Sequence, residues 1–259
     1  MDKLFTNFSQ QFGVKPPKLI HPSAVLVLVH GADGSIASFF ELAKKLNIYV
    51  VALSYVPSLA SDCKTIEQFA AVYLEQVQQY YTATSYILAG HSFGSLVAYE
   101  MAKQAYLLSN EPVPVILLDP NLPLAMRHYQ VERGLELRLL ASTIFSEQMI
   151  RQHNIYQCDE ALLLALLSRC FNRERLETIL SARKHCISTL NKYSYCEHEG
   201  VISTVVHASE KLDYDFVDQD TKYITNGTFV GGNHFTMLHS EHVEDIANII
   251  NARLSTLLF

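Results

Sequence analysis

The sequence predicts an α/β fold with a mostly parallel central sheet. Short apolar, β-branched runs alternate with longer segments of helical periodicity, and the runs are apolar throughout rather than at every second residue. Strands that are buried on both faces have this composition, and helices then cover both faces of the sheet. Of the 259 residues, 49% are apolar and 18% are charged. Since soluble domains average roughly 25% charged residues, this chain can bury a large core.

Six runs are expected to form the strands. They cover residues 24–29, 49–55, 85–89, 113–118, 201–207 and 228–230. Helices are expected at residues 38–46, 65–81, 96–108 and 243–257. In residues 65–81, for example, Ile66, Phe69, Tyr73 and Val77 recur at the spacing of one helical face.

One connection is far longer than the others. From residue 123 to 200 no strand pattern is evident, and the segment is Leu-rich with helical periodicity. Connections in compact domains have a median of about 4–6 residues, so this segment is expected to be a helical lid. We therefore expect a single domain over residues 1–259, with its core at 1–122 and 201–259 and the lid at about 123–200.

Composition and charge exclude several classes of function. The net charge of −6 is a poor basis for binding nucleic acid. The longest apolar runs, such as Ala161 to Leu167, reach seven residues, whereas a membrane-spanning helix needs about 20. The five cysteines are an odd number without a C-x-x-C pair, which is typical of neither a disulfide framework nor a zinc site. Because polar residues also interrupt any signal-peptide pattern near the N-terminus, a cytoplasmic location is expected.

The candidate nucleophile is Ser92, in the sequence Gly90-His91-Ser92-Phe93-Gly94. This G-x-S-x-G pattern lies between a predicted strand and a predicted helix, which is the context of the nucleophile elbow in the α/β-hydrolase fold. The sharp turn holds the serine in a strained conformation, and the flanking glycines have no Cβ to obstruct it. A tight glycine turn with a capping serine is the alternative interpretation.

The serine needs a base, and His234 is the candidate. In the α/β-hydrolase fold the order along the chain is serine, acid, histidine. His234, within Gly231-Gly232-Asn233-His234, follows the last predicted strand and precedes the last helix. Its loop is therefore expected at the same edge of the sheet as Ser92. His91 adjoins the nucleophile and is expected to point away from it.

Two residues are candidates for the acid that orients the base. Asp119 directly follows the fourth predicted strand, and Asp213 lies a few residues past the fifth. Both positions carry the acid in α/β-hydrolases. Asp119 is favoured, because the loop around Asp213 is rich in charge and fits a solvated surface equally well, but the chemistry alone leaves the choice open.

The backbone N–H groups of Ala32 and Phe93 are the candidate oxyanion donors. In this fold one donor comes from the residue after the nucleophile and the other from a loop after a core strand. Phe93 follows Ser92, and Ala32 lies in the loop His30-Gly31-Ala32-Asp33-Gly34 after the first core strand.

Four segments resemble, in chain order, the four motif blocks of thioesterase domains that end fatty-acid, polyketide and nonribosomal-peptide synthases. They are HGADGSIASFFELAKKL, GHSFGSLVAYEMAKQ, VILLDPN and GGNHFTMLHSEHVEDI. The likeness looks closest to the fatty acid synthase type of animals and runs from about residue 24 to the C-terminus. That family usually places the acid where Asp119 lies, whereas stand-alone type II thioesterases place it near Asp213. The chain departs from the family in reading HGADG where HP is frequent, and in having Pro120 after Asp119.

The resemblance implies a substrate and a reaction. The substrate is an acyl chain in thioester linkage to the phosphopantetheine of an acyl carrier protein, or an acyl-CoA-type thioester. The enzyme releases it through an acyl-enzyme on Ser92, either alone or as part of a multidomain synthase, and needs no metal or organic cofactor. The enzymatic alternatives are a type II editing thioesterase and an oxygen-ester hydrolase or lipase on the same scaffold, and a binding module is the non-enzymatic one.

The resemblance also gives the lid two expected tasks. Carrier proteins of these systems are acidic, whereas residues 122–200 carry ten basic and nine acidic groups, or +1, against −7 for the rest of the chain. Arg169, Arg173, Arg175, Arg183 and Lys184 are therefore candidates for docking a carrier protein, although a solvated helix face is the favoured interpretation of these charges. The run Ala161 to Leu167, with Phe145 and Phe171, either lines an acyl channel or packs the lid on its own core.

Overall fold

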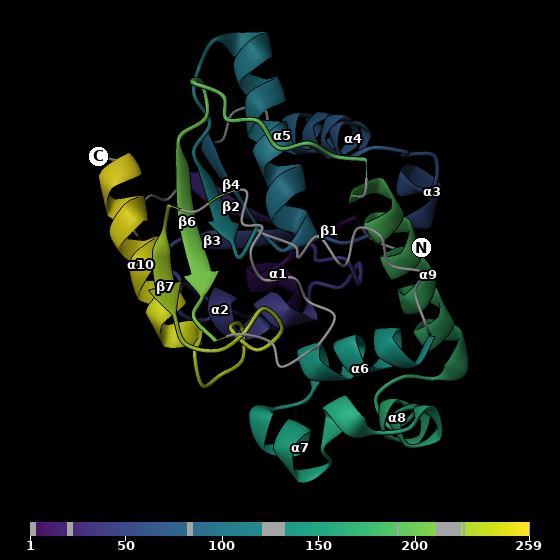
Figure 1. Ribbon diagram of the computed structural model, residues 1–259. Helices are drawn as coiled ribbons and strands as arrows, with labels where there is room; N and C mark the ends of the chain where they lie inside the picture. The colour runs from purple at the N-terminus through teal and green to yellow at the C-terminus, as the bar shows by residue number, and fades with distance from the viewer. Residues whose placement is uncertain are drawn as a thin grey trace.

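A seven-stranded sheet forms the centre of the molecule (Figure 1). The computed structural model describes residues 4–19, 23–81, 85–120, 133–190, 192–210, 224 and 226–258. The strand order is β1-β3-β2-β4-β5-β6-β7. The strands are β1 (Phe5–Asn7), β2 (Ala24–Val29), β3 (Tyr49–Leu53), β4 (Ser85–His91), β5 (Val115–Leu118), β6 (Ser203–Ala208) and β7 (Thr228–Val230). Every described pair is parallel except β1 with β3, so the sheet is mostly parallel, as predicted.

Helices cover both faces of the sheet, and each face has its own apolar core (Figure 1). One core packs α3 (Pro57–Ala60), α4 (Ile66–Tyr80) and α5 (Phe93–Ser109) on the sheet. The other packs α1 (Phe8–Phe12), the 3-10 turn η1 (Ala37–Phe39), α2 (Phe40–Ala43) and α10 (Val243–Leu257). Along β2, Val25 and Val27 face the first core, whereas Leu26 and Leu28 face the second. This two-sided burial explains why the strand is apolar at every position.

The structure corrects several predicted boundaries. The run predicted as a strand to residue 55 leaves the sheet after Leu53, because the N–H of Tyr55 donates to the Gly34 carbonyl of the neighbouring loop at 3.0 Å. The helix predicted at residues 38–46 is only η1 followed by the single turn of α2. The antiparallel edge strand β1 is absent from the prediction, since three residues carry too little pattern to recognise.

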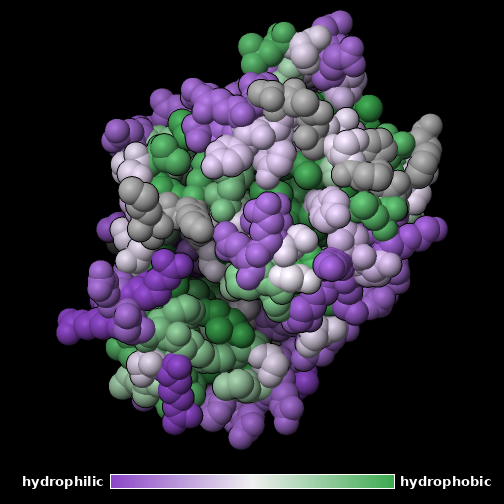
Figure 2. Space-filling model, turned by 180° about the vertical axis from the view of Figure 1, so that it is seen from behind, coloured by the Kyte–Doolittle hydropathy of each residue, from purple (hydrophilic) through white to green (hydrophobic). Residues whose placement is uncertain are grey.

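Within the described residues the predicted lid is helical from residue 133 to 190 apart from short turns, whereas residues 192–200 are irregular, and its helices lie beside the strand layer (Figure 1). It contains α6 (Arg133–Ile144), α7 (Glu147–Gln152), the 3-10 turn η3 (Ile155–Gln157), α8 (Glu160–Leu167) and α9 (Arg173–Leu190). These helices pack on an apolar core of their own, and Figure 2 shows hydrophobic residues reaching the surface over them. We call α6 to α9 the lid helices. No helix in the described part of the chain is long and apolar enough to span a bilayer.

His185 fixes the lid to the core. Its Nε2–H donates to the Cys63 carbonyl at 2.7 Å, so its Nδ1 accepts the Tyr55 hydroxyl at 2.8 Å. Helix α9 thereby reaches both Tyr55, just after β3, and Cys63, just before α4. These two hydrogen bonds hold α9, and with it the lid, near the C-terminal end of strand β3.

Candidate functional site

Ser92 lies on the sharp turn between β4 and α5. Its backbone has φ 57° and ψ −122°, and a serine with positive φ is strained by about 1–3 kcal/mol. The side chain is nevertheless buried, with 5% of its surface exposed. Strain of this size persists only where the surrounding structure enforces it. A strained serine on a sharp turn between strand and helix is the geometry expected of a nucleophile elbow.

The flanking glycines allow this turn because the backbones around it approach closely. A Cβ on Gly90 would lie 2.2 Å from the carbonyl carbon and oxygen of Gly94. A Cβ on Gly94 would lie 2.3 Å from the Val29 carbonyl oxygen at the end of β2. Any other residue at either position would push α5 away from the strands, so the two glycines set the position of Ser92.

His234 contacts the nucleophile. Its Nε2 lies 2.8 Å from Ser92 Oγ, and its Nδ1 lies 2.7 Å from Asp119 Oδ2. Because a carboxylate only accepts hydrogen bonds, Nδ1–H donates to Asp119 and Nε2 accepts the serine hydroxyl. A turn holds the loop, since Asn233 Oδ1 accepts the N–H groups of Phe235 and Thr236. The three residues form one hydrogen-bonded chain from carboxylate to hydroxyl.

Asp119 is held by strand β6 as well as by His234. It follows β5 with φ 42°, and its N–H donates to the Val206 carbonyl at 2.7 Å. Its Oδ1 accepts the Ala208 N–H at 3.3 Å, and Nδ1 of the buried His207 lies 3.5 Å from the same oxygen. Burial acts to raise the pKa of Asp119, but the His207 and His234 rings outweigh it and hold the pKa well below its ordinary value. Asp119 is therefore ionised, as an orienting acid must be.

The other candidate acid, Asp213, belongs to residues 211–223, which lie outside the described residues. The structure places Asp119 against His234.

The predicted oxyanion donors lie on the two segments beside the nucleophile. Phe93 is the first residue of α5, and Ala32 lies in the loop after β2, the neighbour of β4 in the sheet. Both residues are buried. Within the described residues, no hydrogen bond engages the N–H of either one. Buried N–H groups without partners are rare, so these two are free to bind a developing negative charge.

The sequence interpretation missed the role of His91. Its Nε2–H donates to the carbonyl oxygen of His234 at 2.9 Å, and the two rings lie with centroids 5.0 Å apart. His91 thus holds the base loop against the nucleophile turn. Its place in the motif could have indicated a role, but the sequence does not show the direction of a side chain on so sharp a turn.

Two buried histidines near the site predict that acid weakens the fold. Burial lowers the pKa of His30 to about 4 and that of His91 to about 3, against 6.5 for an exposed histidine. Unfolding therefore takes up protons below about pH 6.5, and the free energy of unfolding falls as the pH drops from there towards 3. Urea denaturation between pH 7 and 4.5 measures this slope. In His91→Gln the slope should be shallower, and an unchanged slope would contradict the assignment to His91.

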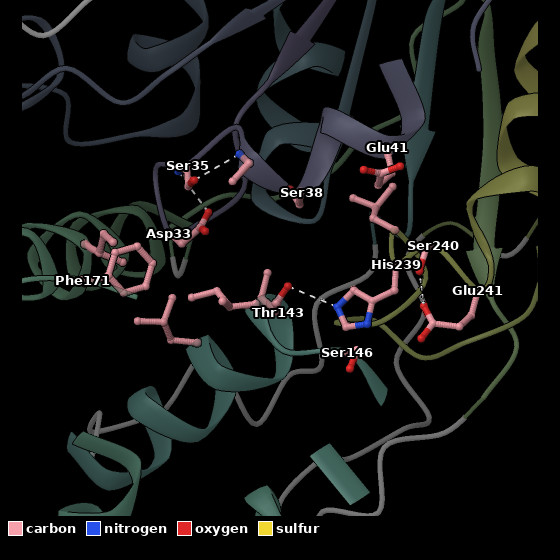
Figure 3. A pocket seen from close by; sticks show the side chains of 15 residues that line it. Asp33, Ser35, Ser38, Glu41, Thr143, Ser146, Phe171, His239, Ser240 and Glu241 are labelled. Atoms are coloured by element: carbon pink, nitrogen blue, oxygen red, sulfur yellow. Dashed lines mark hydrogen bonds between the residues drawn. The ribbon is translucent and has the colours of Figure 1, made fainter. Parts of the chain in front are cut away.

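A cavity of about 360 Å³ lies between the lid and the loops that carry the oxyanion donor and the base (Figure 3). Leu140 and Ile144 of α6, Phe171 and Leu238 give it an apolar wall. His239 joins the two sides, since its Nε2–H donates to the Thr143 carbonyl of α6 at 3.2 Å. The volume is within the range of small-molecule sites, about 300–1,000 Å³.

The lid residues that we expected to serve an acyl chain divide into two groups. Phe171 lines the cavity. Leu163, Leu166, Leu167 and Phe145 instead pack in the core of the lid helices. The buried leucines of the Leu-rich run therefore pack the lid on its own core and do not line an acyl channel.

The lid residues expected to dock an acidic partner also divide. Arg183 is buried and forms an ion pair with the equally buried Glu136 of α6, so it is not available for docking and its expected role there is wrong. Arg169, Arg173, Arg175 and Lys184 are exposed. In the described part of the chain, no group of three or more His, Cys, Asp or Glu residues is placed to bind a metal ion.

Comparison with protein families identifies the chain. A sequence model of the thioesterase domain matches residues 24–254, nearly the whole length. The chain belongs to the thioesterase domain family. Thioesterase domains are hydrolases, and the resemblance of the four motif blocks to this family is confirmed at that level.

Solved structures share the fold of this thioesterase domain. A four-domain nonribosomal peptide synthetase bound to AMP and glycine is 20% identical with a TM-score of 0.65; the alignment covers 91% of this chain and 20% of the synthetase. This thioesterase domain therefore spans about a fifth of that protein's length. The NocB thioesterase domain, in covalent complex with a fluorophosphonate nocardicin G analogue, is 20% identical over 89% of this chain and 94% of NocB, with a TM-score of 0.62. The type II thioesterase YbtT of the yersiniabactin pathway is 17% identical over 96% of both chains, with a TM-score of 0.62. The predicted α/β-hydrolase fold is confirmed.

Proposed function

We propose that this thioesterase domain releases an acyl chain from the phosphopantetheine thioester of a carrier protein through an acyl-enzyme on Ser92. The hydrogen-bonded chain from Asp119 through His234 to Ser92 carries the proposal. Residues 1–122 and 201–259 form the core of one domain, and residues 123–200 form its lid. A cytoplasmic location, expected from the cysteine pattern, is part of the same proposal.

The chemistry follows from the geometry of the site. His234 takes the proton of Ser92 as Oγ attacks the thioester carbonyl, and ionised Asp119 stabilises the imidazolium that forms. The N–H groups of Ala32 and Phe93 bind the oxyanion, and the thiol leaves with the proton from His234. Water, activated by the same histidine, then attacks the acyl-enzyme and frees the acid and Ser92.

The acyl group lies in the cavity between the lid and the core. Ser92 and His234 do not line this cavity themselves, but Asp33 and Leu238 on one side of it belong to the loops that carry Ala32 and His234. The apolar wall of Leu140, Ile144, Phe171 and Leu238 suits a fatty-acyl or polyketide-like chain. Likeness to the animal fatty acid synthase type rests on the sequence motifs alone, since none of the structures compared above is such a domain.

An editing role, in which a separate type II enzyme clears carrier proteins, is the second candidate function. The match to YbtT, a type II thioesterase, over 96% of both chains supports it. The match to one part of a four-domain synthetase favours the alternative, a domain within a synthase. In either case the exposed Arg169, Arg173, Arg175 and Lys184 offer a basic lid face to an acidic carrier protein.

Matched substrates test this function against an oxygen-ester hydrolase or lipase. The chain is given octanoyl-pantetheine and the corresponding oxygen ester, and kcat/KM is measured for both. We expect the thioester to be preferred by at least about tenfold. A preference for the oxygen ester would overturn the proposal, and activity that survives in Ser92→Ala would overturn the proposed mechanism.

A further inference from the structure

A buried pair of side chains, Tyr73 and His30, lies behind the oxyanion loop. Neither residue exposes any of its surface. His30 Nε2 lies 2.7 Å from the Tyr73 hydroxyl of α4, and His30 Nδ1 lies 2.6 Å from the Gly31 carbonyl oxygen. The proposed acyl transfer gives this pair no direct task, because neither side chain belongs to the chain of residues from Asp119 to Ser92.

The direction of each hydrogen bond follows from its acceptor. A carbonyl oxygen only accepts, so His30 Nδ1–H donates to Gly31 and its Nε2 accepts the Tyr73 hydroxyl. Burial lowers the pKa of His30 to about 4, so the ring is neutral at neutral pH and keeps this single tautomer. Tyr73, His30 and the Gly31 carbonyl form a chain of hydrogen bonds that all point the same way.

That chain ends on the peptide unit that carries the Ala32 N–H. The Gly31 carbonyl and the Ala32 N–H belong to one planar trans peptide, so they point in opposite directions. The Gly31 carbonyl oxygen also accepts the Gly34 N–H at 3.0 Å. His30 Nδ1–H and the Gly34 N–H therefore both hold the Gly31 carbonyl in place. The Ala32 N–H of the same peptide points the opposite way and has no hydrogen-bond partner in the described residues.

His30 also contacts the second oxyanion donor residue. Its ring stacks on the Phe93 ring, with centroids 5.8 Å apart and an interplanar angle of 19°. One neutral imidazole thus touches both segments that supply oxyanion N–H groups, the loop after β2 and the first turn of α5.

We infer that Tyr73 and His30 are positioning residues for the oxyanion hole, aligning and polarising the peptide that presents the Ala32 N–H. Consecutive hydrogen bonds strengthen one another by perhaps about 10–30% per bond, so donors on the Gly31 carbonyl make the N–H of the same peptide more acidic. This inference rests on the proposed function only in assigning Ala32 N–H to an oxyanion.

Three variants and one control test the pair. Tyr73→Phe removes the distal hydroxyl, His30→Leu removes both hydrogen bonds, and His30→Asn keeps an N–H donor near the position of Nδ1. Tyr99→Phe is the matched control. Tyr99 is also buried and its hydroxyl also holds a neighbouring segment, donating to the Cys196 carbonyl and accepting the His198 N–H, and in the described part of the chain neither of these hydrogen bonds involves a residue of the site.

For each protein we would measure kcat and KM for a thioester, the rate constant for labelling by a fluorophosphonate, and the melting temperature. Losing an oxyanion donor costs about 10²–10³ in kcat, so misaligning one in His30→Leu should cost about 10–100-fold in kcat and in labelling rate, with KM nearly unchanged. Tyr73→Phe should lose about three- to tenfold, and His30→Asn should recover most of the loss seen in His30→Leu.

Several outcomes would overturn the inference. Equal losses in Tyr73→Phe and Tyr99→Phe, no recovery in His30→Asn, or a rise in KM with kcat unchanged would show a merely structural role. If His30→Leu does not fold, the inference is tested by comparing the kcat and labelling losses of Tyr73→Phe with those of Tyr99→Phe. A wild-type protein that is labelled at Ser92 but hydrolyses no thioester would contradict the proposed function, while the labelling rates would still test the pair. A protein without either reaction would overturn both.

Discussion

Ser92→Ala should abolish thioester turnover while leaving the fold intact. Without Oγ no acyl-enzyme forms, and removing the nucleophile of a comparable serine hydrolase costs about 10⁶-fold in kcat. The residue stays in the positive-φ turn between Gly90 and Gly94, so the backbone that it shares with α5 is preserved. Steady-state hydrolysis of an acyl-pantetheine, followed by thiol release, measures the loss.

The control for this variant is Ser109→Ala, at the far end of the same helix. Its Oγ donates to the Ala105 carbonyl at 2.9 Å, so the substitution also removes a serine hydroxyl from α5 but leaves the site untouched. The control should keep the wild-type kcat. If Ser92→Ala retained turnover comparable with Ser109→Ala, Ser92 would not be the nucleophile.

Asp119→Asn should have the second largest effect, about 10⁴-fold in kcat with little change in KM. The amide keeps the size of the side chain but removes the charge, and it favours the tautomer of His234 that cannot accept the Ser92 proton. Oδ1 accepts the Ala208 N–H and Oδ2 accepts His234 Nδ1–H, and among the described residues no other carboxylate bonds to His234.

Asp213→Asn serves as the direct comparison, since Asp213 was the other acid weighed from the sequence. We expect that variant to stay within about threefold of the wild type, because Asp119 already orients His234. A larger kcat loss in Asp213→Asn than in Asp119→Asn would transfer the role of the acid to Asp213.

The α/β layers and the catalytic segments could be predicted because they depend on local patterns. Strand β2 is apolar at all six positions, and the G-x-S-x-G turn requires glycines that a close approach of backbones then explains. The same reasoning placed His234 by its position between the last strand and the last helix. Each of these features depends on residues that are consecutive in the chain, so it can be predicted without knowing which distant segments contact one another.

What could not be predicted depends on side-chain direction and on contacts between distant segments. Asp119 contacts His234 across 115 positions, and the local sequence favours Asp119 over Asp213 as the acid without deciding between them. Arg183 looks like a surface charge in the sequence, yet it is buried against Glu136, 47 positions away. The contact between Tyr73 and His30 spans 43 positions.

The most direct test of the account is to find the acyl group on the enzyme. The protein is mixed with an acyl-pantetheine thioester, quenched in acid within one turnover, digested and analysed by mass spectrometry. We expect the acyl mass on the peptide that contains Ser92, and its absence from the same peptide of Ser92→Ala. Rapid thioester hydrolysis with no adduct on that peptide, or an adduct on another residue, would contradict it.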